Sequence, residues 1–143
     1  MCDSRVQDHY AKAGPRDRIA ARILAAFRAT EGDAAPITPE TLAPFDHYHG
    51  GGLAATKAMA SVLQPQAGET VVDIGSGIGG RARWIAKQFS CAVTGVDLTP
   101  EFCDAARELN GLSGLADCVN ILQGSALALP LSAAVFDRAY SPS

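Results

Sequence analysis

The chain has 143 residues, of which 48% are hydrophobic and 19% charged, and its formal net charge is −3. This composition is typical of a globular domain and excludes a disordered segment, and the small negative charge excludes the broad basic surface of a nucleic-acid-binding domain. No run reaches the roughly 18 apolar residues of a membrane span, and the first ten residues lack a signal-peptide core. We therefore expect a soluble cytoplasmic protein.

The four cysteines indicate free thiols rather than disulfides or a metal site. Cys2, Cys91, Cys103 and Cys118 form no C-x-x-C pair, and no two histidines have the spacing of zinc ligands. We expect the thiols to be buried, in a reducing compartment, and we expect no metal.

The first half of the chain predicts helices joined by loops. Residues 15–31 begin with proline and place apolar side chains on one helical face, and Gly32 is a suitable stop. Within the following loop, residues 38–40 (Thr-Pro-Glu) fit the start of a short helical turn. The polar and aromatic stretch 45–52 (FDHYHGGG) then precedes a second helix at 53–64.

From residue 70 onward, short apolar strands alternate with amphipathic helices. The predicted strands are 70–74, 91–97, 118–124 and 135–140. A helix with a buried stripe of Ala82, Ile85, Ala86 and Phe89 follows the first strand, and another begins at Thr99. The stripe of that helix is Phe102, Ala105, Ala106 and Leu109, and Asn110-Gly111 is expected to end it. This alternation predicts an α/β fold with a parallel sheet.

The loop after the first strand fits two cofactor patterns. Gly75, Gly77 and Gly80 satisfy the dinucleotide spacing G-x-G-x-x-G, whereas Gly75, Gly77 and Gly79 satisfy the D-x-G-x-G-x-G pattern of proteins that bind S-adenosylmethionine. In both cases, backbone N–H groups at the helix start favour an anionic group of the ligand. The glycines alone do not decide between the two.

Asp97 ends the second strand, 22 residues after Gly75. A carboxylate at this position accepts hydrogen bonds from both ribose hydroxyls of NAD or S-adenosylmethionine, and it would repel the 2′-phosphate of NADP. The structural alternative is that Asp97 caps the next helix, although Thr99 already suits that role.

Three features favour S-adenosylmethionine. About seventy residues precede the glycine loop, which is typical of a lid or substrate region and unusual in small dinucleotide folds. Asp73 lies inside a buried strand, where it needs a partner such as the ammonium group of the methionine moiety, directly or through water. Third, the segment QGSALALPL follows the third strand, and FDRAYS comes after it.

These segments resemble the successive motifs of class I S-adenosylmethionine-dependent methyltransferases. The matching stretches are VVDIGSGIGG, TGVDLTPEF, ILQGSALALPL and VFDRAYS. The stretch FDHYHGGGLAATK is similar to a type 11-like bacterial branch that acts on small molecules, such as sarcosine/dimethylglycine and ubiquinone-pathway methyltransferases. The resemblance implies a Rossmann-like sheet with strand order 3-2-1-4, an N-terminal helical lid segment (1–52) and an S-adenosylmethionine-binding part (53–143).

The resemblance also implies a set of cofactor-binding residues. The methionine part would lie on Asp73, Gly75, Ser76, Gly77 and Gly79, and the ribose on Asp97. Leu98 would pack on the adenine, and Gly124, Ser125 and Ala126 would flank its edge, with Ser125 standing where many relatives carry aspartate. Tyr140 and Ser141 would line the reactive methyl group.

Methyl transfer depends mainly on alignment, and a general base helps when the acceptor holds a proton. His49 and Tyr48, within the cluster around Asp46 and His47, are the candidates to contact the acceptor. We expect that acceptor to be a small molecule and not a nucleic acid, because no basic stripe accompanies the site.

The chain ends soon after the predicted fourth strand, whereas family sheets have seven strands. We therefore expect a truncated, cofactor-binding half of a methyltransferase, with VFDRAY as an exposed edge strand. The alternative from another class is a non-catalytic interaction module that self-associates through this edge. An NAD-binding dehydrogenase is the less favoured third possibility.

Overall fold

The computed structural model of the chain describes residues 18–47, 51–131 and 136–141. Strands and helices alternate from β1 to β3, as the hydrophobic pattern predicts, and the next described element is β4. The elements in chain order are α2 (Ile19–Glu31), α3 (Pro39–Asp46), α4 (Gly52–Leu63), β1 (Thr70–Ile74), α5 (Gly80–Phe89), β2 (Ala92–Asp97), α6 (Pro100–Leu112), β3 (Val119–Gln123) and β4 (Arg138–Tyr140).

The strands form one parallel sheet with the order β3-β2-β1-β4, which confirms the expected α/β class and strand order. Asp73 of β1 lies opposite Gly95 of β2 and Tyr140 of β4. The carboxyl ends of β1 and β2 therefore meet at one edge, and in open α/β sheets this edge is where ligands bind. In the described part of the chain, β4 pairs with β1 alone, and self-association through its other edge stays a prediction.

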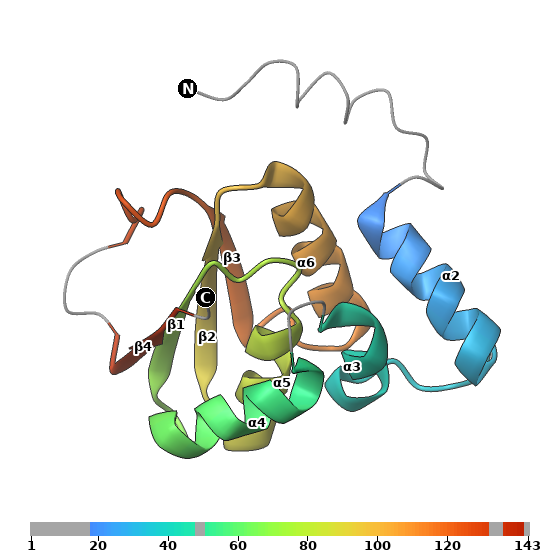
Figure 1. The fold of residues 1–143 in the computed structure, drawn as a ribbon, viewed down its shortest axis with the longest axis horizontal. Coiled ribbons are helices and arrows are strands. Elements are labelled where there is room, and N and C mark those ends of the chain that lie inside the picture. Colours follow the sequence, from blue (N-terminus) through green and yellow to red (C-terminus); the bar gives the residue numbers. More distant parts are fainter. Residues whose placement is uncertain (1–17, 48–50, 132–135, 142–143) are drawn as a thin grey trace.

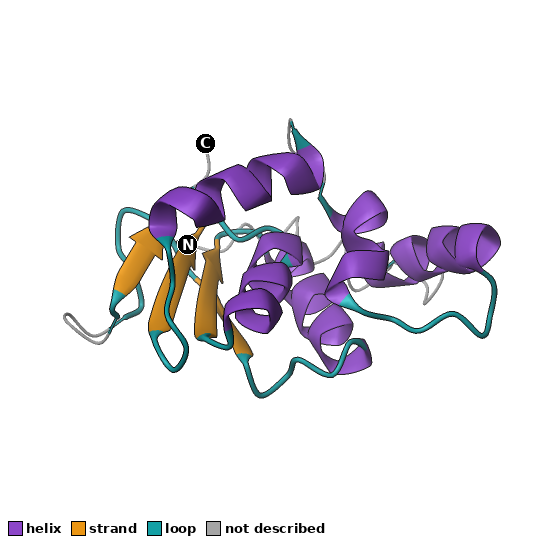
Figure 2. Cartoon of the chain, turned by 90° about the horizontal axis from the view of Figure 1, so that it is seen from below, coloured by secondary structure: helices purple, strands orange, loops and turns teal. Residues whose placement is uncertain are grey.

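The sheet lies at one end of the molecule and α2 with α3 at the opposite end (Figures 1 and 2). Helices α5 and α6 occupy the space between, where they contact β2 and β3 on one side and α3 and α2 on the other. Among the described residues, α2 and α3 are thus linked to the sheet mainly through α5 and α6, and α3 also contacts α4.

Two apolar clusters hold these layers together. The first joins the sheet to α4 and α5 around Val71, Ile85 and Val93. The second joins α2 and α3 to Ile78 and to the Leu109 side of α6. The second cluster combines residues from before and after position 52. The division of the chain at residue 52 into a lid and a cofactor-binding part stays a prediction.

Helix α3 has eight residues, where the sequence indicated only a short turn. Its start is strongly fixed: the Thr38 hydroxyl accepts from the backbone N–H of Thr41, and the Thr41 hydroxyl accepts from the backbone N–H of Thr38. Pro39 occupies the first turn, where it costs no hydrogen bond. Asp46, expected in a loop, is therefore the last residue of a helix.

Three details of the sequence prediction were wrong. Helix α6 continues through Asn110-Gly111 to Leu112, because the buried Asn110 side chain is held by Arg83 and by the carbonyl of Val119. Phe102, assigned to the buried stripe, is 39% exposed. Cys118 is exposed, whereas Cys91 and Cys103 are buried free thiols as expected and Cys2 lies outside the described residues.

In the part of the chain that the structure describes, no helix is both long enough and apolar enough to span a bilayer.

Candidate functional site

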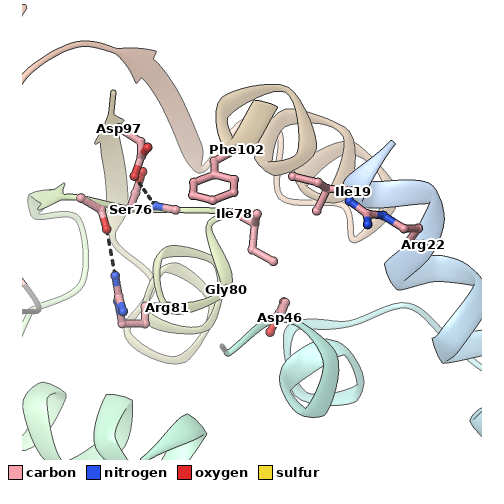
Figure 3. A pocket seen from close by; sticks show the side chains of 11 residues that line it. Ile19, Arg22, Asp46, Ser76, Ile78, Gly80, Arg81, Asp97 and Phe102 are labelled. Carbon is pink, nitrogen blue, oxygen red and sulfur yellow. Dashed lines mark hydrogen bonds between the residues drawn. The ribbon is translucent and has the colours of Figure 1, made fainter. Parts of the chain in front are cut away.

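A cavity of about 670 Å³ opens beside the carboxyl ends of β1 and β2, between the glycine loop and the N-terminal helices (Figure 3). This volume is within the range of roughly 300–1,000 Å³ found for small-molecule sites. Its lining residues are Ile19, Arg22, Asp46, Gly75, Ser76, Gly77, Ile78, Gly80, Arg81, Asp97 and Phe102.

The glycine loop forms the floor of the cavity. Gly75, Gly77 and Gly79 have φ angles of 78°, 59° and 85°, in the left-handed region where other residues are strained. The backbone N–H groups of Gly75 and Ser76 both donate to the carbonyl of Val96, at 2.8 and 3.1 Å. Gly79 is the N-cap of α5, so the positive end of that helix dipole faces the same region. Of the predicted loop residues, Gly75, Ser76 and Gly77 line the cavity and Gly79 does not, and their role in binding a cofactor stays a prediction.

Asp97 lines the cavity beside this loop. Its Oδ2 accepts from the backbone N–H of Gly77 at 2.8 Å, and its Oδ1 accepts from the backbone N–H of Thr99 at 2.9 Å. Each carboxylate oxygen has a second lone pair for a ligand donor. The carboxylate therefore supports the start of α6 and also faces the cavity, whereas the Thr99 side chain makes no capping bond.

Asp73 lies beneath the loop and is fully buried. Tyr140 donates its hydroxyl to Asp73 Oδ2 at 2.7 Å, and Arg81 Nη2 lies 4.0 Å from Oδ1. Burial raises the pKa of the Asp73 carboxyl from 3.8 to about 6, although the Arg81 charge opposes that rise. Burial and the nearby Asp73 charge raise the pKa of the Tyr140 hydroxyl well above its ordinary range. Neither Asp73 nor Tyr140 lines the cavity.

Arg81, which sequence reasoning missed, does line the cavity. It comes from the first turn of α5 and bends back so that its Nη2 donates to the carbonyl of Gly75 at 3.1 Å. The sequence did contain a signal for this residue. Arg81 follows closely after the strand that carries Asp73, and a cation near a buried acid is a candidate partner for that acid.

Asp46 lines the cavity from the end of α3 and belongs to a buried polar network. Its Oδ2 accepts from Arg83 Nη2 at 3.1 Å, and its Oδ1 lies 2.7 Å from His47 Nδ1. The Arg83 side chain is 0% exposed and also donates to Asn110 Oδ1 at 3.0 Å. This network fixes the end of α3 against α5 and α6.

Several residues predicted to bind the cofactor lie outside the cavity wall. Leu98 is 68% exposed and does not line the cavity, whereas Phe102, four residues later, does. Residues 124–126 follow β3, and the Ser125 hydroxyl accepts from the backbone N–H of Leu127 at 3.1 Å. Tyr48 and His49 lie outside the described residues. The proposed roles of all these residues in binding the cofactor or the acceptor stay predictions.

Gly80 offers a test of how closely α3 approaches the start of α5. A Cβ at Gly80 would lie 2.7 Å from the Asp46 carbonyl oxygen and 2.8 Å from its Oδ1. We expect Gly80→Ala to lower the free energy of unfolding by about 1–3 kcal/mol, because the end of α3 must move. Urea unfolding followed by circular dichroism measures this.

The matched control for that substitution is Gly111→Ala. Gly111 is also helical, but a Cβ there meets nothing within 4 Å. We expect the control to be neutral or slightly stabilising, because alanine favours helix more than glycine does. Equal effects at the two positions would contradict the close contact between Asp46 and Gly80.

Comparisons with known proteins point to one family. A family model described as a methyltransferase domain matches residues 71–143, from β1 onward. Rice (Oryza sativa subsp. japonica) 24-methylenesterol C-methyltransferase 2 is 35% identical over 83 residues, 58% of this chain and 23% of that protein. The glycine/sarcosine/dimethylglycine N-methyltransferase of Actinopolyspora halophila is 32% identical over 71 residues, 50% of this chain and 13% of that protein.

The fold of this chain is also similar to that of a solved structure. The crystal structure of a SAM-dependent methyltransferase from Thiobacillus denitrificans in complex with S-adenosyl-L-homocysteine matches with a TM-score of 0.55 at 25% identity. The match covers 84% of this chain and 42% of that one. The aligned segments thus make up 23% and 13% of the two curated relatives and less than half of the solved structure.

Proposed function

This chain belongs to the methyltransferase domain family, and on that premise we propose that its cavity binds S-adenosylmethionine for methyl transfer to a small-molecule acceptor. The observation that carries the proposal is the Asp97 carboxylate. It faces the cavity, and its Oδ2 lies 2.8 Å from the backbone nitrogen of Gly77 in the glycine loop. This arrangement fits a ribose that is joined to a group lying on the loop.

The described residues fit the parts of this cofactor. Asp97 would accept the ribose hydroxyls, and the ring of Phe102 offers an apolar surface for the adenine beside it (Figure 3). The methionine part would lie over Gly75–Gly79, where the Ser76 hydroxyl is buried without a hydrogen-bond partner in the described structure. Gly95 allows that hydroxyl to fit, because a Cβ there would lie 2.7 Å from it.

When bound, the cofactor would supply a sulfonium methyl group that is open to in-line displacement. The residues of the chain would then bind the cofactor, orient it toward the acceptor and exclude water from the site. Ile19 and Ile78 bring apolar surface to the cavity, and helix α2 closes the side opposite the glycine loop (Figure 3). Tyr48 and His49 remain our candidates to contact the acceptor and to receive its proton where it carries one.

The test is calorimetric titration with S-adenosylhomocysteine and, separately, with NAD. We expect binding of the first, and we expect Asp97→Ala to weaken it at least about 10-fold, because a hydrogen bond to a charged group contributes about 1.5–3 kcal/mol. Asp104→Ala is the matched control, since Asp104 is an exposed acid on α6 whose side chain pairs with Arg107. Unchanged affinity of the Asp97→Ala variant, or binding of NAD alone, would contradict the proposal.

The remaining expectations belong to the same proposal. We place the protein in the cytoplasm, with residues 1–52 as a lid and 53–143 as the cofactor-binding part. Similarity to N-methyltransferases and C-methyltransferases alike supports a small-molecule acceptor and leaves the methylated atom open. Pairing of two chains through the free edge of β4 is a second proposed property, and sedimentation analysis at several concentrations tests it.

A further inference from the structure

We infer that Arg81, rather than Asp73, makes the direct contact with the amino-acid end of the cofactor and binds its carboxylate. This inference rests on the proposed function. It assigns to Asp73 an indirect role, because Asp73 would orient the Arg81 guanidinium from behind the glycine loop. The family resemblance had placed Asp73 itself on the methionine moiety.

The first step is that the Asp73 carboxylate does not reach the cavity. The residue is 0% exposed and is not part of the cavity wall. Its Oδ2 accepts the Tyr140 hydroxyl at 2.7 Å from the side of β4. Its other oxygen, Oδ1, is buried without a hydrogen-bond partner in the described structure, and the Arg81 Nη2 lies 4.0 Å from it.

The second step is that Arg81 does reach the cavity. Its side chain is only 9% exposed, yet it lines the cavity beside the glycine loop (Figure 3). The Gly75 carbonyl at 3.1 Å holds one end of the guanidinium in place. A cation fixed against the loop that carries the methionine part is well positioned for the negative group of that part.

The third step is that Arg81 retains unused donors. A guanidinium carries five N–H bonds, and the hydrogen bond that the Arg81 side chain makes in the described structure is the one from Nη2 to the Gly75 carbonyl, so other N–H groups of its two Nη atoms remain for a ligand. Three other charged residues among those described line the cavity: Asp97 accepts from the backbone N–H groups of Gly77 and Thr99, Asp46 is engaged by Arg83 and His47, and the third is Arg22. Arg22 extends from α2, at the far side of the cavity from Arg81 (Figure 3). A carboxylate over the glycine loop therefore meets Arg81 first, in the field of the α5 N-terminus.

The experiment compares two ligands by calorimetry on the whole chain. S-adenosylhomocysteine contains the amino-acid group, whereas 5′-methylthioadenosine lacks it and keeps the adenosine. We expect Arg81→Gln to weaken S-adenosylhomocysteine binding at least about 10-fold and to leave methylthioadenosine binding unchanged within about twofold. Arg81→Lys, which keeps the charge but loses the fork of donors, is expected to give an intermediate loss.

The matched control is Arg107→Gln, which makes the same charge change at an exposed site on α6. It is expected to alter neither affinity. Equal weakening of both ligands by Arg81→Gln, or no weakening of either, would overturn the inference while leaving the proposed function intact. If the unchanged chain bound neither ligand, the proposed function would fail, and this inference with it.

Discussion

Replacing Asp46 by alanine is expected to lower the free energy of unfolding by about 3–5 kcal/mol. The substitution leaves the Arg83 guanidinium, which is 0% exposed, without its carboxylate partner at 3.1 Å. The Arg83 guanidinium is buried in the described structure and keeps only neutral partners, so the loss of the carboxylate leaves most of its desolvation uncompensated. Such a loss is a large part of the 5–15 kcal/mol that stabilises an ordinary domain. Urea unfolding followed by circular dichroism measures it.

Two further variants make this prediction specific. Glu40→Ala removes an acid from the same helix, but its pair with Lys87 is about 40% exposed on both sides, and its loss is expected to cost under about 1 kcal/mol. The double variant Asp46→Leu with Arg83→Met replaces both charges by apolar groups and is expected to recover much of the loss. Equal destabilisation by Asp46→Ala and Glu40→Ala would contradict the prediction, because the buried pair would then contribute no more to the free energy of unfolding than the exposed one.

Replacing Asp73 by asparagine is expected to stabilise the chain at neutral pH by up to about 3 kcal/mol. Burial raises the pKa of the Asp73 carboxyl to about 6, against 3.8 ordinarily. Below pH 3.8 the carboxyl is protonated in the folded and unfolded states, and it takes no stability away. As the pH rises from 3.8 to 6, Asp73 loses its proton in the unfolded chain before it does so in the folded chain, so the free energy of unfolding of the unchanged chain falls. Above pH 6 the carboxyl is ionised in both states, and this loss of free energy of unfolding stays constant.

Asparagine does not titrate, and its amide oxygen can still accept from the Tyr140 hydroxyl. The two proteins should therefore have similar thermal stability near pH 4 and diverge as the pH rises to 7. Thermal unfolding at a series of pH values is the measurement, with the exposed Asp104→Asn as control. A variant that is less stable than the unchanged chain at every pH would contradict the prediction. The gain in stability should come with weaker cofactor binding if Asp73 orients Arg81.

The regular elements of the sheet could be predicted because their signals are local. Residues 70–74 are a short apolar run, and the glycines that follow require positive φ angles, so strand and loop appear in the sequence as they do in the structure. The position of Asp97 is set by the end of its strand. Sheet order was available from the resemblance to a family, and the observed strand order β3-β2-β1-β4 agrees with it.

The polar side chains of α5 could not be predicted in this way. Apolar periodicity identified Ala82, Ile85 and Ala86 as buried, and it assigns arginines to the solvent face. In the structure Arg81 and Arg83 are also buried, because each has a partner that is distant in sequence or belongs to the backbone. Asp46 lies 37 residues before Arg83, and no local spacing rule connects two such residues. Phe102 departs from its stripe because the open cavity takes the place of a packing neighbour.

The burial of Arg83 limits how this protein can be divided into modules. A cut at residue 52, where the sequence suggested a boundary, would remove the only acid that pairs with Arg83 in the described structure. Arg83 would then keep only its neutral described partners, Asn110 Oδ1 and the carbonyl of Ala106. Helix α3 is therefore not an appendage that could be exchanged for the lid of a relative. Any graft would have to bring an acid to the position of Asp46 and keep glycine at position 80.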